Sequence, residues 1–417
     1  MIRLVEALRY RSLRYVRQKV TPFMMLVGPN ASGKSTFLDV IRLLGDLLKR
    51  GLPAVRDRSA NFSNLVWMEE GQRFDVALEL DIPEERAKRQ DKNGYRCVRY
   101  EVALGHNSKG ELSILGETLW LKPSDVPPPP LQQRLFPDPP EPTDSLVLAE
   151  GKHAPKGWRK VVTKKPESGN DYFIAETTEW NNSFRLGPQK LALANLPEDE
   201  VRFPVATWVK HVLMEGIQAL TLNSEAMRRP SPPGSPLAFQ PDGSNLPFAI
   251  EHLCTGKPES FERWISHVRT ALPDIKTVET VERPEDKNRY LQVVYRTGLR
   301  APSWTISDGT LRLLALTLIA YLEQDGRVYL IEEPENGIHP RAVETVFQSL
   351  SSAYGSQILC ASHSPVVLSL ADPDQILCFA RTKDGATDIV RGGDHPNLRD
   401  WKHGTDLGTF FATGLLG

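Results

Sequence analysis

The chain contains 417 residues, and its 51 Lys and Arg residues balance 52 Asp and Glu residues to a formal net charge of −1. Because a single hydrophobic core rarely extends beyond about 250–300 residues, two lobes or one elaborated domain are expected. A hydrophobic content of 40% excludes a globally disordered protein. The balanced charge excludes binding to nucleic acid through overall basicity and leaves only local basic patches as an electrostatic route.

The four cysteines predict free thiols rather than a zinc or redox motif. Cys97, Cys254, Cys360 and Cys378 lie far apart, and no pair has CxxC spacing. The N-terminus lacks the apolar core of a signal peptide. The apolar stretch at residues 313–322 is much shorter than the roughly 20 residues that cross a bilayer. We therefore expect a soluble, cytoplasmic protein.

The first third of the chain predicts an α/β arrangement. Residues 1–50 have the pattern of two strands, a loop and a helix. The apolar run at residues 23–27 is typical of a buried parallel strand, and residues 37–48 have helical periodicity. Further strands are predicted at residues 73–82, 95–104 and 111–121, with a hairpin loop at 105–110.

The middle of the chain contains most of the excess proline. Residues 122–142 include PPPP and PDPPEP, which exclude a helix or central strand and predict an extended surface loop. A second proline-rich loop is predicted at residues 229–247. Between and after these loops we expect a helix at 205–219, one or two helices at 248–272, and strands at 276–281 and 290–295.

Roughly the last 120 residues return to an α/β pattern. Helices are predicted at residues 311–322 and 341–353, and strands at 328–331, 357–361 and 375–380. Sustained heptads are absent, which excludes a long coiled-coil arm.

A phosphate-binding motif follows the strand at residues 23–27. GPNASGKS fits G-x-x-x-x-G-K-[ST] and lies between a predicted strand and a predicted helix. In such loops the backbone N–H groups surround the phosphates, so Lys34 is expected at the β and γ phosphates and Ser35 at Mg²⁺. The predicted nucleotide-binding residues are Gly28, Pro29, Asn30, Ala31, Ser32, Gly33, Lys34, Ser35 and Thr36.

Two acidic residues end the strand predicted at residues 328–331. Glu332 and Glu333 therefore lie at the carboxyl edge of a parallel sheet, where ligands bind in open α/β folds. One carboxylate is suited to hold Mg²⁺, and the next to orient and deprotonate a water molecule. The alternative is an acidic turn without function.

Two shorter motifs accompany these. Ser307, Asp308, Gly309 and Thr310 precede a helix and form either an anion site for another molecule's nucleotide or a simple N-cap. His363 follows the strand at 357–361, where it is placed to contact a γ-phosphate or serves a structural role.

GPNASGKST, ISDGTLRLLAL, YLIEEPENGIHP and ASHSP, in this order, resemble the ABC-type ATPase heads of the SMC/RecF-like and OLD-like group, which includes prokaryotic AAA ATPases. The resemblance covers mainly residues 1–50 and 300–380. It implies an α/β P-loop NTPase of the ABC head type, with a mixed central sheet, flanking helices and an inserted α+β lobe. The head would comprise residues 1–115 and 296–417, and the lobe residues 116–295.

The resemblance also implies a composite site. In this group two heads enclose two ATP molecules, so the phosphate loop of one protomer would face Ser307, Asp308 and Gly309 of the other. Glu332 would take the Mg²⁺ position together with Ser35, and Glu333 would be the general base.

Further roles are implied for residues outside the two main motifs. His363 would be the switch histidine, and Asn336 and Gly337 would lie in the D-loop that reaches the other protomer. Arg11 matches the arginine of an "FRS" motif and is expected near the nucleotide. The chain departs from the ABC pattern in three ways: Glu332 replaces aspartate, the signature reads SDG, and the Q-loop glutamine has only Gln72 and Gln90 as candidates.

The leading functional hypothesis is an ATP- and Mg²⁺-dependent ATPase subunit that dimerises around ATP and regulates a separate effector. The effector is expected to be a nuclease or toxin in prokaryotic anti-phage defence or DNA maintenance. Two alternatives remain: a RecF-like DNA-binding repair or loading ATPase, and a nucleotide-gated scaffold with little turnover. The length leaves no room for a fused nuclease domain or coiled-coil arms.

Two basic regions are candidate nucleic-acid contacts, although either can equally be a solvated surface. One comprises Arg3, Arg9, Arg11, Arg14, Arg17 and Lys19; the other lies at residues 152–165 and contains Lys152, Lys156, Arg159, Lys160, Lys164 and Lys165 around Trp158. The apolar C-terminal tail, with Phe410, Phe411, Leu415 and Leu416, either packs on the core or docks a partner.

Overall fold

The computed structural model describes residues 1–69, 71–88, 94–123, 144–148, 155–165, 169–322 and 326–395. The chain forms two compact units. Unit 1 comprises residues 1–21, 30–217 and 379–389, and unit 2 comprises residues 22–29, 218–378 and those from 390 onward. The division into residues 1–115, 116–295 and 296–417 stays a prediction.

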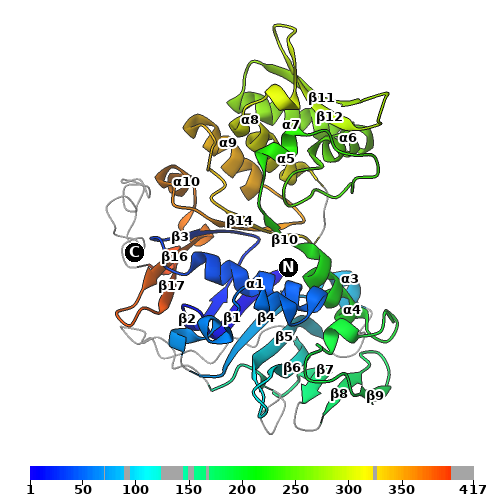
Figure 1. The fold of residues 1–417 in the computed structure, drawn as a ribbon, viewed down its shortest axis with the longest axis vertical. Helices are drawn as coiled ribbons and strands as arrows, with labels where there is room; N and C mark the ends of the chain where they lie inside the picture. The colour runs from blue at the N-terminus through cyan, green and yellow to red at the C-terminus, as the bar shows by residue number, and fades with distance from the viewer. Residues whose placement is uncertain are drawn as a thin grey trace. The chain divides into compact units, whose positions relative to one another are not determined.

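Unit 1 is built on an eight-stranded antiparallel sheet (Figure 1). Its strand order is β2-β1-β4-β5-β6-β7-β8-β9. Helix α1 (Lys34–Arg50) packs against β1 and β4 with the buried face that its periodicity predicted. The strands are β1 (Ile2–Tyr10), β2 (Leu13–Lys19), β4 (Arg73–Asp81), β5 (Tyr95–His106), β6 (Leu112–Pro123), β7 (Arg159–Lys165), β8 (Asn170–Ile174) and β9 (Asn181–Phe184).

The helix predicted at residues 205–219 is shorter than expected. Helix α4 (Pro204–His211) ends in one π-helical turn at Val212–Gly216, and β10 (Ile217–Leu220) follows. This turn lies close to α1, because a Cβ on Gly45 would lie 2.5 Å from the carbonyl oxygen of Leu213. Tertiary packing thus overrides helical periodicity here. Two short helices, α2 (Pro53–Arg56) and α3 (Glu84–Lys88), complete the described α-helices of unit 1.

The six-stranded sheet contains the parallel strands of unit 2. Its order is β10-β14-β15-β3-β16-β17, and β14, β15, β3 and β16 are mutually parallel neighbours. The apolar runs that predicted buried strands form β3 (Phe23–Val27), β14 (Val328–Glu332), β15 (Gln357–Ala361) and β16 (Ile376–Arg381), and β17 (Thr387–Arg391) was not predicted.

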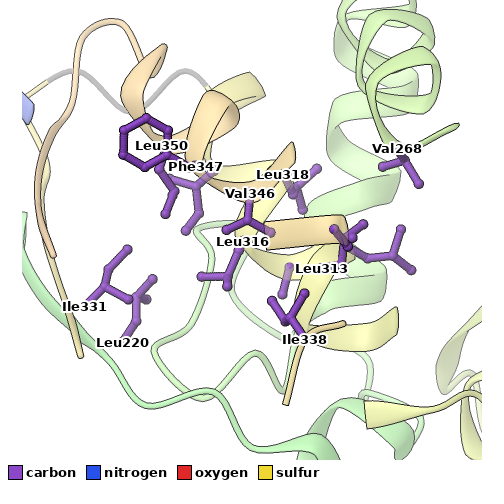
Figure 2. Close-up of a cluster of buried hydrophobic side chains, with 14 of the residues drawn as sticks. Leu220, Val268, Leu313, Leu316, Leu318, Ile331, Ile338, Val346, Phe347 and Leu350 are labelled. Carbon is purple, nitrogen blue, oxygen red and sulfur yellow. The ribbon is translucent and has the colours of Figure 1, made fainter. Parts of the chain in front are cut away.

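The core of unit 2 lies among helices that pack on one another. Figure 2 shows Leu313, Leu316 and Leu318 of α8 gathered with Val346 and Phe347 of α9. The predicted helical region at 248–272 is two helices, with a three-stranded antiparallel sheet beside them. The elements are α5 (Ser224–Arg228), α6 (Leu246–Gly256), α7 (Pro258–Ala271), α8 (Asp308–Leu318), α9 (Pro340–Ser351), α10 (Pro365–Ser369), β11 (Ile275–Glu282), β12 (Arg289–Tyr295) and β13 (Arg300–Pro302).

Several predictions fall outside the described residues. These are the proline-rich loop from residue 124 to 142, Lys152, Gln90, and the apolar tail with Phe410, Phe411, Leu415 and Leu416. All four cysteines are described and are free thiols, as predicted. Within the described parts of the chain, no helix is long and apolar enough to span a membrane.

Candidate functional site

Three of the predicted motifs begin where neighbouring parallel strands of unit 2 end. In register, Glu332 at the end of β14 pairs with Ala361 of β15, which in turn pairs with Leu26 of β3. The N–H of Ser362 donates to the carbonyl of Leu26 over 3.1 Å. The start of the phosphate loop at Gly28, the acidic pair and the segment before His363 therefore follow the carboxyl ends of three adjacent strands. This is the edge at which open α/β sheets bind ligands.

The remainder of the phosphate loop, from Asn30 onward, belongs to unit 1. Gly33 has φ 104°, and a Cβ there would lie 2.1 Å from Thr387 Oγ1 and 3.0 Å from Ser12 Oγ, so only glycine fits. Ala31 also has a positive φ, of 61°. Lys34 opens α1 with its side chain buried, and its Nζ lies 3.5 Å from Ser32 Oγ. The loop thus has the tight turn and helix start that a phosphate cradle needs.

Arg11 lies in the turn between β1 and β2 with φ 51°, and it contacts α1 rather than solvent alone. Its guanidinium lies 3.5 Å from the carboxylate of Asp39 and stacks over Tyr10. Burial opposes ionisation of Asp39, but hydrogen bonds and charge from Arg58 outweigh it and lower the pKa of that carboxyl. Asp39 and Arg58 were not predicted as site residues, because their partners become visible only in the fold.

The acidic pair of unit 2 has an unusual backbone. Glu332 and Glu333 are both exposed, and Glu333 has φ 49°, a conformation that non-glycine residues rarely adopt and that concentrates at functional sites. The N–H of Glu333 donates to the carbonyl of Ala361 over 2.8 Å. Its carboxylate accepts from Asn336 Nδ2 over 2.6 Å. Asn336, predicted to reach the other protomer, therefore holds the predicted base within its own subunit.

His363 is half-buried in the segment after β15. Its backbone N–H lies 3.4 Å from the carboxylate of Glu335, and the hydroxyl of Ser362 donates to the same oxygen over 2.6 Å. Glu335 was not singled out in the sequence. Its position between the predicted base and the D-loop residue Asn336 is the signal that would have found it.

The segment at 307–310 caps helix α8, as one of its two interpretations predicted. Ser307 Oγ accepts from the N–H of Thr310 over 3.3 Å. Asp308 pairs with Arg228, which also donates to the carbonyl of Ile306 over 3.1 Å. The other interpretation, contact with a second molecule's nucleotide, stays a prediction.

The start of α8 also packs against the D-loop. A Cβ on Gly309 would lie 2.6 Å from the carbonyl oxygen of Gly337. Arg312 Nη1 donates to the carbonyl of Asn336 over 3.1 Å. The signature segment and the D-loop are thus linked within one protomer.

The basic run around Trp158 is occupied largely by contacts within unit 1. Lys164 is buried and pairs with Asp171 at 2.7 Å. The ring of Trp158 lies edge-on against Trp120 and has the ammonium of Lys122 over it. These contacts remove Lys164 and much of Trp158 from a nucleic-acid surface.

The N-terminal basic residues are likewise paired in part. Arg3 lies 3.2 Å from Asp81, and Arg14 lies 3.2 Å from Asp384.

The Q-loop candidate Gln72 precedes β4, and its carbonyl accepts from the N–H of His106 over 3.0 Å.

The phosphate-loop motif after β3 and the acidic end of β14, at the carboxyl edge of parallel strands, are features of P-loop nucleotide-binding domains. The family model described as "AAA domain, putative AbiEii toxin, Type IV TA system" matches residues 23–369, and the chain belongs to this family. This confirms the predicted α/β fold class. No curated protein matches the chain.

One solved structure, an SMC head, supports the same fold. A crystal structure of an SMC head bound to the C-winged helix domain of ScpA is 14% identical with a TM-score of 0.52, covering 93% of this chain and 97% of that one. An SMC head domain with an extended coiled coil, bound to the C-terminal domain of ScpA from Pyrococcus furiosus, is 13% identical with a TM-score of 0.49, covering 93% and 95%. At 14% identity the likeness to the first of these structures concerns the fold alone.

Proposed function

We propose that this protein binds and hydrolyses ATP and dimerises around the nucleotide to control a separate effector. The observation that carries the proposal is the common edge of β3, β15 and β14 in unit 2. There Gly28, the Glu332–Glu333 pair and the segment before His363 follow three adjacent parallel strands. A phosphate loop beside an acidic strand end is the arrangement that phosphoryl transfer to water requires.

Each motif has a defined role in this proposal. The loop from Gly28 to Thr36 binds the phosphates, with Lys34 providing the positive charge. Glu333 accepts the proton of the attacking water, because a base must lie next to that water and Glu333 is an exposed carboxylate. His363 contacts the γ-phosphate.

Mg²⁺ fits the donor groups that the motifs provide. Ser35 and Glu332 supply oxygen ligands, which Mg²⁺ prefers, and the nucleotide's own phosphates supply others. In the described parts of the chain, no group of three or more His, Cys, Asp and Glu side chains is arranged to hold a metal by itself. When bound, the ion offsets the negative charge of the phosphates.

Dimerisation is proposed from the start of α8. Ser307, Asp308 and Gly309 are surface residues at a helix N-terminus, fixed by the contacts of Arg228 and Gly337. A helix N-terminus favours negative charge, so it suits the phosphates of a nucleotide bound to a second copy. In this proposal Asn336, on the adjoining loop, joins the contact with the second copy.

The proposed effector is a separately encoded nuclease or toxin in a prokaryotic defence system. The family description calls the AAA domain itself a putative toxin of a Type IV toxin–antitoxin system, so it supports a toxin–antitoxin setting but does not itself point to a separate effector. Because fold does not determine function, this part of the proposal depends on the family alone.

The test is the Glu333→Gln variant of the full chain. It should bind ATP normally, form an ATP-dependent dimer that persists, and lose turnover by about 10²- to 10⁴-fold, the usual contribution of a general base. Sedimentation and phosphate release measure the two effects. Normal turnover in this variant would contradict the assignment of Glu333, and a wild-type protein that dimerises without turnover would favour a nucleotide-gated scaffold.

A further inference from the structure

Glu335 links the loop after β14 to the loop after β15 in unit 2. Its Oε1 accepts a hydrogen bond of 2.6 Å from the hydroxyl of Ser362. The same oxygen lies 3.4 Å from the backbone N–H of His363. One carboxylate oxygen therefore binds the residue before the predicted switch histidine and the backbone of the histidine itself.

Ser362 extends this link to the other side of the histidine. Its side chain is fully buried, and its Oγ accepts from the N–H of Ser364 over 3.0 Å while donating to Glu335. Its own N–H donates to the carbonyl of Leu26 in β3. The backbone on both sides of His363 is thus fixed by one carboxylate–hydroxyl pair.

The other end of the link lies on the loop that carries the predicted base. Glu333 and Asn336 flank Glu335 closely in sequence, and Asn336 donates to the carboxylate of Glu333. The N–H of Asn336 donates to the carbonyl of Glu333 over 3.0 Å, so the segment forms a compact turn. A shift of Glu335 would therefore move both the base loop and the histidine loop.

The second oxygen of Glu335 shows that this placement is costly. Oε2 is buried, and no hydrogen-bond partner for it exists in the described part of the chain. The pKa of the neighbouring Cys360 thiol is raised, first by burial and then by the negative charge of Glu335. A buried carboxylate oxygen without a partner is unfavourable, so the position is not explained by stability alone.

We propose that Glu335 is a positioning residue for the hydrolytic site, acting through Ser362 to set His363 relative to Glu333. The inference rests on the proposed ATPase function and deepens it. Glu335 itself touches neither nucleotide nor water in this proposal. Its contribution comes from holding two loops in one geometry, because small displacements of reacting groups lower rates strongly.

The experiment compares four variants of the full chain: Glu335→Ala, Glu335→Gln, His363→Ala and the Glu335→Ala/His363→Ala double variant. Glu335→Ala should lower kcat by about 10- to 100-fold with KM changed by less than about 3-fold, the pattern of lost positioning. Glu335→Gln retains an acceptor oxygen for Ser362 and should recover most of kcat. The exposed Glu344 of α9 supplies a matched control, since Glu344→Ala should leave kcat unchanged.

The double variant decides how Glu335 acts. If it works through His363, the double variant should be no slower than His363→Ala alone. Additive losses, or a Glu335→Gln variant as slow as Glu335→Ala, would overturn the proposal. A general folding defect would lower kcat additively and would not be rescued by glutamine.

A second measurement separates this proposal from the ATPase proposal. Amide hydrogen exchange of residues 361–364 should accelerate in Glu335→Ala and stay unchanged in His363→Ala, whether or not ATP is hydrolysed. If wild-type protein shows no turnover while exchange responds as expected, the ATPase proposal fails and the link stands. Unchanged exchange in Glu335→Ala would overturn the link itself.

Discussion

The antiparallel sheet of unit 1 and the parallel-strand edge of unit 2 use glutamate in opposite ways. In unit 1, Glu117 is fully buried and accepts hydrogen bonds from Tyr100, from the N–H of Leu193 at 2.8 Å and from the N–H of Ala192. In unit 2, Glu333 is exposed at a strand end and is held through a single side-chain contact in the described structure. The first carboxylate is surrounded by donors, and the second is accessible to a ligand.

The contrast extends to the sheets themselves. Arg99 of unit 1 lies buried within 2.6 Å of both Glu6 and Glu101. The strands β3 and β15 of unit 2 are buried along their whole length and almost entirely apolar. Charges are therefore neutralised inside the sheet of unit 1 and are absent from β3 and β15 of unit 2. Charged groups buried in pairs maintain structure, whereas those at strand ends are available for chemistry.

The largest predicted effect is on ATP affinity, and it should distinguish two buried lysines of unit 1, Lys34 and Lys122. Lys34→Met should weaken ATP binding by at least about 100-fold, because the loop loses its phosphate-binding charge while the apolar stem is kept. The midpoint of thermal unfolding of the Lys34→Met variant should differ little from that of the wild type. Titration with a fluorescent ATP analogue and a melting curve measure the two quantities.

Lys122→Met is the matched control. The ammonium of Lys122 is buried and bonds both oxygens of Glu79 at 2.9 Å. This variant should lower stability and leave ATP affinity within about 3-fold, since breaking a buried ion pair costs about 3–5 kcal/mol. Equal effects of both substitutions on ATP affinity would show that the distinction between sheet and loop lysines is wrong.

The parts predicted from sequence are those in which local pattern and tertiary role agree. Buried parallel strands were predicted from the apolar runs of β3, β14 and β15. A phosphate cradle was predicted from the glycines of the phosphate loop. A cap at Ser307 or Asp308 was one of two interpretations of the segment before α8, and Ser307 is the cap; capping was predictable because it depends on the next three residues alone.

The parts that were missed depend on partners distant in the chain. Strand β7 contains Thr163 and Lys164, polar residues that become buried because Lys164 pairs with Asp171. Glu335 binds Ser362, which lies 27 residues away. Composition and periodicity carry no information on such pairs, so neither the strand nor the link could be derived.

The next largest predicted effect concerns Glu117 of unit 1 and its contribution to stability. Glu117→Ala should lower the free energy of unfolding by about 2–5 kcal/mol, because it leaves Tyr100 and two buried backbone N–H groups without an acceptor. Denaturant unfolding measures this loss. The exposed Glu198→Ala is a control that should cost less than about 1 kcal/mol. If Glu117→Ala also lowered the free energy of unfolding by less than about 1 kcal/mol, the structural role of Glu117 would be contradicted.

The same residue predicts a pH dependence. Burial raises the pKa of Glu117 to about 7 from its ordinary value of 4.5. The folded state then binds the proton more tightly than the unfolded state, so the contribution of Glu117 to stability is greatest below the unfolded pKa and falls as pH rises toward about 7. The cost of Glu117→Ala should thus be larger at pH 5 than at pH 8, by at most about 3 kcal/mol. A cost that is larger at pH 8 would reverse the sign and contradict the raised pKa.

The smallest expected effect on stability concerns the cap of α8, where the two interpretations of one residue can be separated. Ser307→Ala should cost about 1 kcal/mol, because the N–H of Thr310 loses its acceptor. Ser307→Asp keeps a good cap and should therefore leave stability within a few tenths of a kcal/mol of wild type. It also places a negative charge where a second protomer's phosphates are proposed to bind, and this charge should prevent ATP-dependent dimerisation by repulsion. If Ser307→Asp is stable and dimerises normally with ATP, α8 is capped like any other helix and the signature has no role at the nucleotide.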